Sequence, residues 1–384
     1  MIEYLDIEQR NLYDKFLEFS RNNITPYSNS WERQECIPRE IIDMCSEEGY
    51  MGGMLPAQYK GKDWNITTYG LFNEVVGCSS VSLSGLFNVH TMIQQTILKW
   101  GTEKQRDLWL PKMAEGEIIG AFALTEPEAG SDIKEIKTEF TQRNDKLILN
   151  GKKRWITFGG IADVVLVFGK LEGKAVACLV ERDTPGFTIT QVTDMLGFKA
   201  SQLAVLEFNN CEVDINNMIG KPGFALSHIA PYALEFGRVS VAFAALGILR
   251  GCLEICGLHS LERKTFGKRL VEHGSIGKMI TDMGVDLEAA SLLCLNACKL
   301  KDEHSPDATE KIMIAKYFTT CAAAKHSSNA VQILGALGCS GNSPLSRYYR
   351  DSKAMEIIEG SSQIHQMMLS IGFSRKSKRN KSNY

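Results

Sequence analysis

The sequence changes its apolar period twice, and these changes constrain the fold more than any other feature. Apolar residues recur at helical spacing over about residues 1–118, form short β-type runs over 119–220, and return to helical spacing over 221–372. Helices repeat apolar side chains three and four residues apart, whereas half-buried strands alternate them every second residue. The 384 residues are also too many for one ordinary core. The sequence therefore predicts an N-terminal helical domain, a central β domain and a C-terminal helical domain.

The N-terminal domain contains three stretches of helical character. Residues 7–19 are amphipathic, residues 38–49 begin with Pro38 and end with Gly49, and residues 73–100 are apolar and rich in small side chains. Proline suits the first turn of a helix, and glycine suits its end. We expect two short helices followed by a buried helix pair.

Turn signals divide the central segment into short runs. They include the dipeptides Asn150-Gly151 and Pro185-Gly186, which favour tight turns. A compact all-β unit of about 100 residues is a usual domain size. The predicted strands cover residues 118–124, 146–149, 164–168, 175–180, 187–191 and 203–208.

The C-terminal segment has the pattern of an antiparallel helical bundle. Ser305 and Pro306 suit the N-cap and first position of one of its helices. Residues 373–384 are basic and polar, and we expect this tail to be disordered. One helix is indicated by apolar or small residues at alternating spacings of four and three, namely Ile276, Ile280, Met283, Leu287, Ala290, Cys294 and Ala297.

Composition limits the classes of function. The net charge of -2, with 23% charged residues, gives no general attraction to nucleic acid or to an anionic membrane. The N-terminus carries Glu3, Asp6 and Glu8, unlike a secretory signal. No uncharged apolar stretch approaches about 20 residues, so no membrane span is expected. The 11 scattered cysteines include no CxxC pair, which favours reduced core cysteines in the cytoplasm over a metal site.

Several catalytic signatures are absent from the sequence. It has no GxSxG nucleophile elbow, and no Gly-Lys pair is followed by serine or threonine, as a P-loop requires. No glutamate has a histidine three residues later, which argues against a di-iron carboxylate bundle. Hydrolase, nucleotide-hydrolysing and di-iron classes are therefore disfavoured.

Five segments resemble the acyl-CoA dehydrogenase family. Each is weak alone, but together they follow the family's order and cover nearly the whole chain. They are ALTEPEAGSD at 123–132, GKKRWIT at 151–157 with Ala162-Asp163, RKTFG at 263–267, QILG at 332–335, and Arg350-Asp351 followed by IEGSSQ at 358–363.

The resemblance implies a mainly α fold with a central β-barrel domain and a C-terminal four-helix bundle. In that family FAD lies in the cleft between the β-barrel and the bundle. Each FAD also contacts the neighbouring subunit of a homodimer or homotetramer. FAD and a second copy of the chain are therefore the expected cofactor and partner.

Glu359 matches the catalytic base of that family. Oxidising a thioester-bound acyl group needs a base for a proton, an acceptor for a hydride and polarisation of the carbonyl. No side chain accepts hydride, so a cofactor must do so. Gly360 lets the backbone approach the carbonyl, which the amide of the glutamate helps to bind in the family, and burial should raise the pKa of the carboxyl. The alternative interpretation is a solvated glutamate at a helix end.

Some family members carry the base on an earlier helix, directly before an arginine. That arginine matches Arg238, and Gly237 precedes it, so the alternative position is empty. Glu235 is nearby but out of register, and Glu356 is expected to be a structural or surface carboxylate.

The resemblance also assigns binding residues. Trp155 would lie against the isoalloxazine ring, and the Thr157 hydroxyl would hydrogen-bond near its reactive N5. Arg263 would reach the pyrophosphate of the FAD in a partner subunit. The cofactor-binding set is Phe122, Leu124, Thr125, Ser131, Trp155, Thr157, Arg263, Phe266, Gln332, Gly335, Ser361 and Gln363, and the substrate-binding set is Ser131, Arg238 and Gly360.

A narrower resemblance concerns the carrier of the acyl group. Residues 77–82, 232–250 and 355–362 are similar to dehydrogenases that prepare methoxymalonyl or hydroxymalonyl extender units on acyl carrier proteins for polyketide and antibiotic biosynthesis. This resemblance implies oxidation at C3 of a small glyceryl-type group, with Glu359 still the base. The alternatives are a catabolic short- or branched-chain acyl-CoA dehydrogenase, an acyl-CoA oxidase and a non-catalytic helical scaffold. The electron acceptor stays open.

Four positions depart from the family pattern. Glu128 replaces a glycine near the flavin edge, and Gly274 stands where a glutamine often contacts the partner's flavin. Ala336 replaces a glycine, and Ile358 replaces an aromatic residue. The last change alters the wall beside the expected base, so the family's chain-length rules do not transfer.

Overall fold

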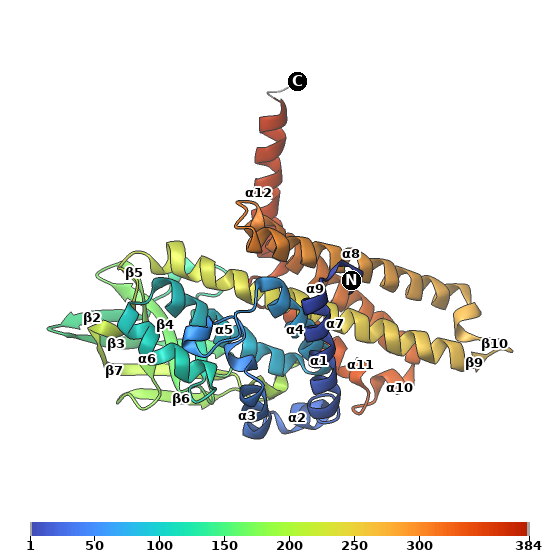
Figure 1. The fold of residues 1–384 in the computed structure, drawn as a ribbon, viewed down its shortest axis with the longest axis horizontal. Helices are drawn as coiled ribbons and strands as arrows, with labels where there is room; N and C mark the ends of the chain where they lie inside the picture. The colour runs from blue at the N-terminus through green and yellow to red at the C-terminus, as the bar shows by residue number, and fades with distance from the viewer. Residues whose placement is uncertain (1, 382–384) are drawn as a thin grey trace.

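The computed structural model describes residues 2–381, which are helical at both ends of the chain and β in the middle. In Figure 1 the strands of the central domain lie at one end of the molecule, and the C-terminal helices extend to the other end. The predicted fold class is therefore confirmed.

Side-chain capping begins several of the N-terminal helices. The Asp6 carboxylate accepts a hydrogen bond from the Gln9 amide (2.8 Å), and the Gln9 side chain accepts one from the Asp6 amide (3.2 Å), which together form a capping box. Pro38 precedes α3, and Gly49 follows it at φ 76°, in agreement with the prediction. The helices are α1 (Ile7–Asn23), α2 (Ser28–Gln34), α3 (Arg39–Glu47), α4 (Ile66–Ser79), α5 (Val81–Trp100) and α6 (Glu103–Ala114).

The predicted buried helix pair consists of α4 and α5. Nearly every residue of both helices is buried, including the polar Asn73 and Asn88. Ser80 separates the two helices, and its hydroxyl caps α5 by accepting from the Leu83 amide (3.2 Å). Helices that are apolar on all sides lie in the interior of a protein, and this pair forms the centre of the molecule.

The central domain is one eight-stranded sheet. Its order is β6-β7-β3-β2-β4-β5-β8, with β1 paired in parallel with β4, and it has its own hydrophobic core. The sequence does not predict β2, in which only Phe140 is buried, or the two-residue β8. The strands are β1 (Gly120–Ala123), β2 (Glu139–Arg143), β3 (Lys146–Ile156), β4 (Val164–Leu171), β5 (Lys174–Glu181), β6 (Phe187–Gln191), β7 (Ala204–Asp214) and β8 (Met218–Ile219).

Strand β3 is irregular near its end. Its pairing with β7 shifts register between Lys153 and Ile156, and Trp155 adopts φ 63° in this interval. An irregularity of this kind re-aims the neighbouring side chains. Trp155 is accordingly exposed over 42% of its surface, whereas Ile156 beside it is buried.

Long helices form the C-terminal domain, and α7, α8 and α9 pack against one another. The predicted apolar seam of α8 is confirmed, since Met283, Ala290, Cys294 and Ala297 are all buried. The elements are α7 (Ala230–Glu262), β9 (Lys264–Thr265), β10 (Lys268–Arg269), α8 (Gly274–Asp302), α9 (Ala308–Leu334), α10 (Ala336–Cys339), α11 (Pro344–Met355) and α12 (Ser362–Lys381).

Helix α9 begins later than the sequence predicts. Its first residue is Ala308 and its N-cap residue is Asp307. The Ser305 hydroxyl accepts from the Asp307 amide (3.3 Å), so Ser305 and Pro306 form the turn before the helix. Serine and proline are favoured in turns as well as at the first positions of a helix, so their presence does not separate the two.

The end of the chain also differs from the prediction. The sequence predicts a disordered tail from residue 373, but α12 remains helical to Lys381 and stands out from the rest of the molecule (Figure 1). Lys376 forms ion pairs with Glu310 (2.7 Å) and Asp307 (3.6 Å) at the start of α9. These exposed ion pairs place this part of α12 beside the start of α9. Residues 382–384 of the predicted tail lie outside the described residues.

The stretch Ala225–Glu262, which includes α7, is long and apolar enough to cross a membrane by length and composition alone. Its most apolar window is 78% buried inside the protein, and core helices of soluble proteins pass the same test. Arg238 and Arg250 interrupt its apolar sequence. No other helix among residues 2–381 passes this test.

We predict that Gly247→Ala destabilises the protein, although alanine is the better helix former. A Cβ at position 247 would lie 2.2 Å from the Glu74 carbonyl oxygen and 2.7 Å from the Cys78 amide nitrogen, so α4 and α7 would have to move apart. Overpacking of this kind costs about 1–3 kcal/mol. Urea unfolding should show a lower midpoint.

The matched control is Gly257→Ala on the same helix. A Cβ at position 257 meets nothing within 4 Å, so this variant should keep or raise the free energy of unfolding, by up to about 1 kcal/mol. Equal effects of the two substitutions would contradict the close packing of α4 on α7.

Candidate active site

Glu359 lies in a tight turn between α11 and α12. Glu359 has φ 54° and Gly360 has φ 92°, so two consecutive residues adopt the left-handed region. Residues other than glycine rarely do so, and such strain is concentrated at functional sites. The Ser362 amide donates to the Glu356 carbonyl (2.9 Å) and closes the turn.

The Glu359 carboxylate points at α7. A Cβ added at Gly237 would lie 2.4 Å from Glu359 Oε2, so a side chain at this position would force the carboxylate to shift. Gly237 stands directly before Arg238, where some family members carry the base. In this structure the Glu359 carboxylate lies against that position.

The Glu359 carboxylate lacks a full set of hydrogen bonds. Its Oε2 is buried and has no partner among the described residues. Burial raises the pKa of the Glu359 carboxyl to about 7, while the Arg238 and Lys316 cations and a hydrogen bond with Asn88 act in the opposite direction. A carboxyl with a pKa near neutral is suited to proton transfer at that pH. This environment is not that of a solvated helix-end glutamate.

Two buried cations hold the backbone of this turn. Arg238 Nε donates to the Glu359 carbonyl (3.3 Å), and Lys316 Nζ donates to the Gly360 carbonyl (2.7 Å). Both side chains are buried, and burial lowers the pKa of Lys316 to about 8. Side chains from α7 and α9 thus fix a turn whose backbone conformation is unfavourable by itself.

His365 packs against the same turn. Its Nε2 would lie 3.2 Å from a Cβ added at Gly360, and neither ring nitrogen has a partner among the described residues. Burial, with the Lys316 and Arg238 cations, lowers the pKa of His365 to about 3. The ring is therefore neutral at neutral pH and adds no charge beside Glu359.

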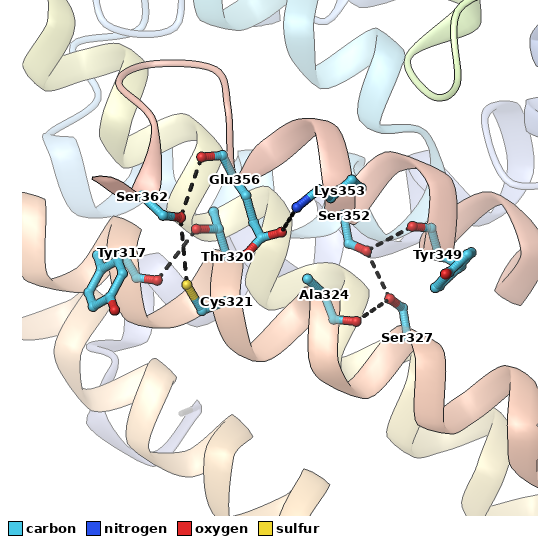
Figure 2. A network of polar contacts seen from close by, with 10 residues as sticks. All are labelled: Tyr317, Thr320, Cys321, Ala324, Ser327, Tyr349, Ser352, Lys353, Glu356 and Ser362. Atoms are coloured by element: carbon cyan, nitrogen blue, oxygen red, sulfur yellow. Dashed lines mark hydrogen bonds and ion pairs between the residues drawn. The ribbon is translucent and has the colours of Figure 1, made fainter. Parts of the chain in front are cut away.

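Two other carboxylates near the turn already have partners. Figure 2 shows Glu356 directed at Lys353, whose Nζ donates to Glu356 Oε2 (2.9 Å). Glu235 accepts hydrogen bonds from Lys301 and from the Thr309 hydroxyl. These contacts agree with the expectation that Glu356 is a structural or surface carboxylate, and they show that Glu235 is also paired.

A small cavity lies beside Glu359. Its volume is about 30 Å³, which is room for one or two water molecules. Parts of all three domains meet at it. The lining residues are Val81, Ser84, Gly85, Asn88 and Val89 of α5, Thr157 and Phe198 of the β domain, Ser240, Val241 and Ala244 of α7, and Met355, Ile358 and Glu359 of the C-terminal segment.

The cavity brings the predicted flavin edge to the predicted base. Thr157 and Glu359 both line it, although 201 intervening residues separate them. Trp155, two residues before Thr157, presents an exposed ring, and the Arg154 guanidinium lies 4.3 Å from the centre of that ring. These are surfaces that a flat heteroaromatic ring could contact.

The other predicted residues of the β edge differ in exposure. Phe122 and Leu124 are buried, and the Phe122 ring packs on Phe168 with ring centres 4.8 Å apart. Thr125 is part-buried and Ser131 is exposed. The Phe122 side chain therefore belongs to the core, which leaves its backbone to face a cofactor.

A buried ion pair joins the two strand edges of this region, and the sequence analysis missed it. Lys153 Nζ donates to Glu126 Oε1 (2.7 Å) and to the Leu124 carbonyl (3.1 Å), and the Arg154 amide donates to the Thr125 carbonyl (3.0 Å). Burial lowers the pKa of Lys153 to about 8. The available signal is a lysine at a position of β3 that alternation turns inward. Its partner lies 27 residues away in the chain, and only the fold shows it.

Four predicted cofactor residues lie far from this cavity within one chain. Arg263 directly precedes β9, and Phe266 lies in the turn between β9 and β10. Figure 1 shows this hairpin at the opposite end of the molecule from the β domain. The Phe266 side chain is 96% exposed. Gln332 and Gly335, at the end of α9, are also exposed. Their predicted contacts with the FAD of a second subunit stay a prediction.

The residues at the junction of the β domain and the C-terminal helices fit FAD. Trp155 offers exposed aromatic surface, and Thr157 lines the same cavity as the unpartnered Glu359 Oε2. Ser361 and Gln363, predicted to contact the flavin, follow Glu359 directly and are part-buried and exposed. The set supplies stacking, hydrogen bonding and a base, which a flavin-dependent oxidation of an acyl group requires.

Models of the acyl-CoA dehydrogenase family match all three parts of the chain. The N-terminal domain model matches residues 6–117, the middle domain model 121–211 and the C-terminal domain model 227–372. An acyl-CoA dehydrogenase of Bacillus subtilis (strain 168) is 34% identical over 359 residues, which cover 92% of this chain and 94% of that protein.

Solved structures share the fold over nearly the whole chain. Butyryl-CoA dehydrogenase from Megasphaera elsdenii has a TM-score of 0.92 and 31% identity, over 96% of this chain and 98% of that one. The prolyl acyl carrier protein oxidase AnaB has a TM-score of 0.91 and 27% identity, over 96% and 99%. FkbI, for biosynthesis of the methoxymalonyl extender unit of the Fk520 polyketide, has a TM-score of 0.86 and 27% identity, over 96% and 99%.

The sequence motifs, the order of the domains and these matches agree along the chain. Family members bind FAD, and the residues at the junction fit that cofactor. This protein therefore belongs to the acyl-CoA dehydrogenase family.

Proposed function

We propose that this protein is an FAD-dependent dehydrogenase of thioester-bound acyl groups, with Glu359 as its catalytic base. One observation carries the proposal: the buried Glu359 Oε2 has no hydrogen-bond partner among the described residues and lines a cavity with Thr157. Buried carboxylates are normally paired. An unpaired one beside a cavity is suited to act on a bound molecule.

The residues around the cavity have distinct roles in this proposal. Glu359 Oε2 takes up a proton from the acyl group, and the Glu359 amide binds the thioester carbonyl. FAD, when bound, supplies the hydride acceptor that no side chain provides, with Trp155 against its ring and Thr157 hydrogen-bonded to it. Arg238 and Lys316 hold the turn, so the base keeps its position as its charge changes.

A second copy of the chain would complete the cofactor site. Arg263, Phe266, Gln332 and Gly335 lie at the end of the molecule away from the β domain, and Phe266 has almost its whole surface exposed. We propose a homodimer or homotetramer in which these residues contact the FAD of a neighbouring subunit. All 11 cysteines are unpaired, which supports a reducing compartment such as the cytoplasm.

The finer proposal is a small acyl group carried by an acyl carrier protein in polyketide or related secondary metabolism, oxidised at C3. Similarity to AnaB and FkbI supports the biosynthetic setting. The second candidate is a catabolic short- or branched-chain acyl-CoA dehydrogenase. Similarity to the Bacillus subtilis protein and to butyryl-CoA dehydrogenase favours that candidate.

Anaerobic mixing distinguishes the two candidates. The purified holoenzyme is mixed with glyceryl-loaded carrier protein and, separately, with propionyl-, butyryl- and isobutyryl-CoA, and the loss of flavin absorbance is followed. The biosynthetic proposal expects rapid loss with the loaded carrier protein. Rapid loss with the ordinary acyl-CoA thioesters instead would favour the catabolic candidate.

We predict that Glu359→Gln removes turnover and keeps the flavin. Glutamine preserves the shape of the side chain but cannot take up the proton, and loss of a general base costs about 10²–10⁴-fold in rate. The matched control is Glu356→Gln, because Glu356 is paired with Lys353 and should be dispensable for turnover. Equal rate losses in both variants, at equal flavin content, would argue against Glu359 as the base.

The rate should depend on pH through the ionisation of Glu359. The base acts as the carboxylate, and its pKa is raised to about 7. The value of kcat/KM should therefore rise with pH up to about 7 and then level off, and well below that pH it should fall about tenfold per unit. Turnover assays from acidic to mildly alkaline pH measure this. A rate that is flat through this range would contradict the assignment.

We predict that Gly237→Ala lowers turnover by displacing the carboxylate of Glu359. The added Cβ would lie 2.4 Å from Oε2, and a displacement of about 1 Å at a reacting group costs about 10²-fold. Steady-state assays with flavin quantification test this. Gly257→Ala, where a Cβ has free space, is the control and should keep the parent rate.

A further inference from the structure

The Asp351 carboxylate, from the Arg350-Asp351 pair in α11, is completely buried and binds the β domain. Its Oδ1 accepts a hydrogen bond from the Phe198 amide (2.9 Å), 153 positions away in the sequence. Its Oδ2 is buried and has no partner among residues 2–381. Buried polar atoms are normally hydrogen-bonded, so this half-satisfied carboxylate calls for an explanation.

A second buried carboxylate binds the next amide of the same segment. Glu32, from α2 of the N-terminal domain, accepts hydrogen bonds from the Lys199 amide (2.9 Å) and from the Ser82 hydroxyl. Only 4% of its surface is exposed. Two consecutive amides between β6 and β7 are thus each bound by a carboxylate from a different domain. The segment that they hold, residues 197–202, is called the 197–202 loop below.

The two carboxylates lie close together, and the neighbouring cations bind other groups. Arg347 and Arg350 donate their hydrogen bonds to an asparagine side chain and to backbone carbonyls. Burial and the nearby Glu32 raise the pKa of Asp351 well above its usual value, while the Phe198 amide and the two arginines act in the opposite direction. Both oxygens of Glu32 accept hydrogen bonds, whereas Asp351 Oδ2 accepts none. The shared proton therefore belongs on Asp351, because close carboxylates do not both ionise readily.

The 197–202 loop has a backbone that must be held in place. Phe198 has φ 55° and Gln202 has φ 46°, and such conformations persist only where the surroundings enforce them. The loop also approaches α11 closely. A Cβ added at Gly197 would lie 2.7 Å from the Arg350 carbonyl oxygen and 2.8 Å from Asp351 Oδ1. The loop is thus packed directly on the helix that supplies one of its two carboxylates.

The other side of the 197–202 loop reaches the candidate active site. The Phe198 side chain lines the cavity together with Glu359 and Thr157. The Ser201 carbonyl accepts a hydrogen bond from the Phe158 amide (2.9 Å), and Phe158 directly follows Thr157. A shift of the loop would therefore move one wall of the cavity and the residue next to Thr157.

We propose that Asp351 and Glu32 are positioning residues for the oxidation. They act through the 197–202 loop, which keeps Phe198 and Thr157 in place relative to Glu359. Asp351 does this as a neutral acid, which offers an acceptor to the loop and adds no second charge beside Glu32. The inference rests on the proposed function, because it takes Glu359 as the reacting group.

The test compares Asp351→Asn with Asp351→Ala. Asparagine keeps the Oδ1 acceptor and resembles the neutral acid, whereas alanine leaves the Phe198 amide unpaired. Each holoenzyme is mixed anaerobically with the acyl thioester that reduces the parent flavin fastest, and the rate is measured per bound flavin. Since a displacement of about 1 Å at a reacting site costs about 10²-fold, Asp351→Ala should be at least about tenfold slower. Asp351→Asn should stay close to the parent. A parent-like rate in Asp351→Ala, or equal losses in both variants, would overturn the proposal.

Ser352→Ala is the matched control on the same helix. Figure 2 shows the Ser352 hydroxyl bonded to the Ser327 hydroxyl (2.8 Å) and the Tyr349 carbonyl (3.1 Å), so its hydrogen bonds lie within α9 and α11. This variant should lower the melting temperature and keep the rate per bound flavin. A loss of rate as large as that of Asp351→Ala would show a general effect of stability and contradict a positioning role.

Gly197→Ala tests the loop without altering either carboxylate, and it serves if Asp351→Ala does not fold. The added Cβ would push the loop away from α11, and flavin reduction should again be slower. An unchanged rate in the folded variant would count against the proposal.

Hydrogen exchange of the 197–202 loop, followed by mass spectrometry, tests the contact without turnover. Exchange should be faster in Asp351→Ala than in the parent and in Asp351→Asn, because the Phe198 amide loses its acceptor. Unchanged exchange would overturn the inference whatever the enzyme oxidises. Faster exchange with a parent-like rate of flavin reduction would leave the proposed function standing and remove the positioning role.

Discussion

The desolvation of one carboxylate, Glu359, is the constraint on which the rest of the site depends. An ionisable oxygen buried without a partner is unfavourable, and the fold must hold it there. Gly237 leaves the space that Oε2 occupies, while Arg238 and Lys316 bind the carbonyls of the strained turn. The cations contact the backbone and leave Oε2 unpaired, so they offset only part of the effect of burial on the pKa of the carboxyl.

The β domain forms the side of the cavity opposite Glu359. There too, an irregular backbone and a buried ion pair position the side chains. The register shift in β3 exposes Trp155 and places Thr157 on the cavity. The pair Lys153–Glu126 connects β3 to the loop after β1, so it joins the two segments that carry the predicted flavin-binding residues of the β domain. Removing one partner of a buried pair costs about 3–5 kcal/mol, which makes this pair a support for the cofactor region. Both halves of the site thus depend on buried charges that contact backbone.

Much of the architecture follows from local sequence. The buried pair α4 and α5, the helix begun after Pro38 and the seam of α8 were predictable, because apolar period and capping residues act over a few neighbours. The incorrect predictions fall where the local sequence gives a weak signal or where contacts come from distant residues. Strand β2 has a single buried side chain and gives almost no periodic signal, and the ion pair of Lys376 with Glu310 of α9 joins residues far apart in the chain.

The sequence by itself determined the order of the three domains and singled out Glu359 as the expected base, with Gly237 leaving the alternative position before Arg238 empty. Only the tertiary structure decided that the Glu359 carboxylate fills the space at Gly237, that Lys316 holds the next carbonyl, and that Glu32 and Asp351 bind neighbouring amides of one loop. The physical reason is that the pKa and the hydrogen-bonding capacity of a group are set by what surrounds it in space. Residues far apart in the chain create that environment, and no local pattern records it.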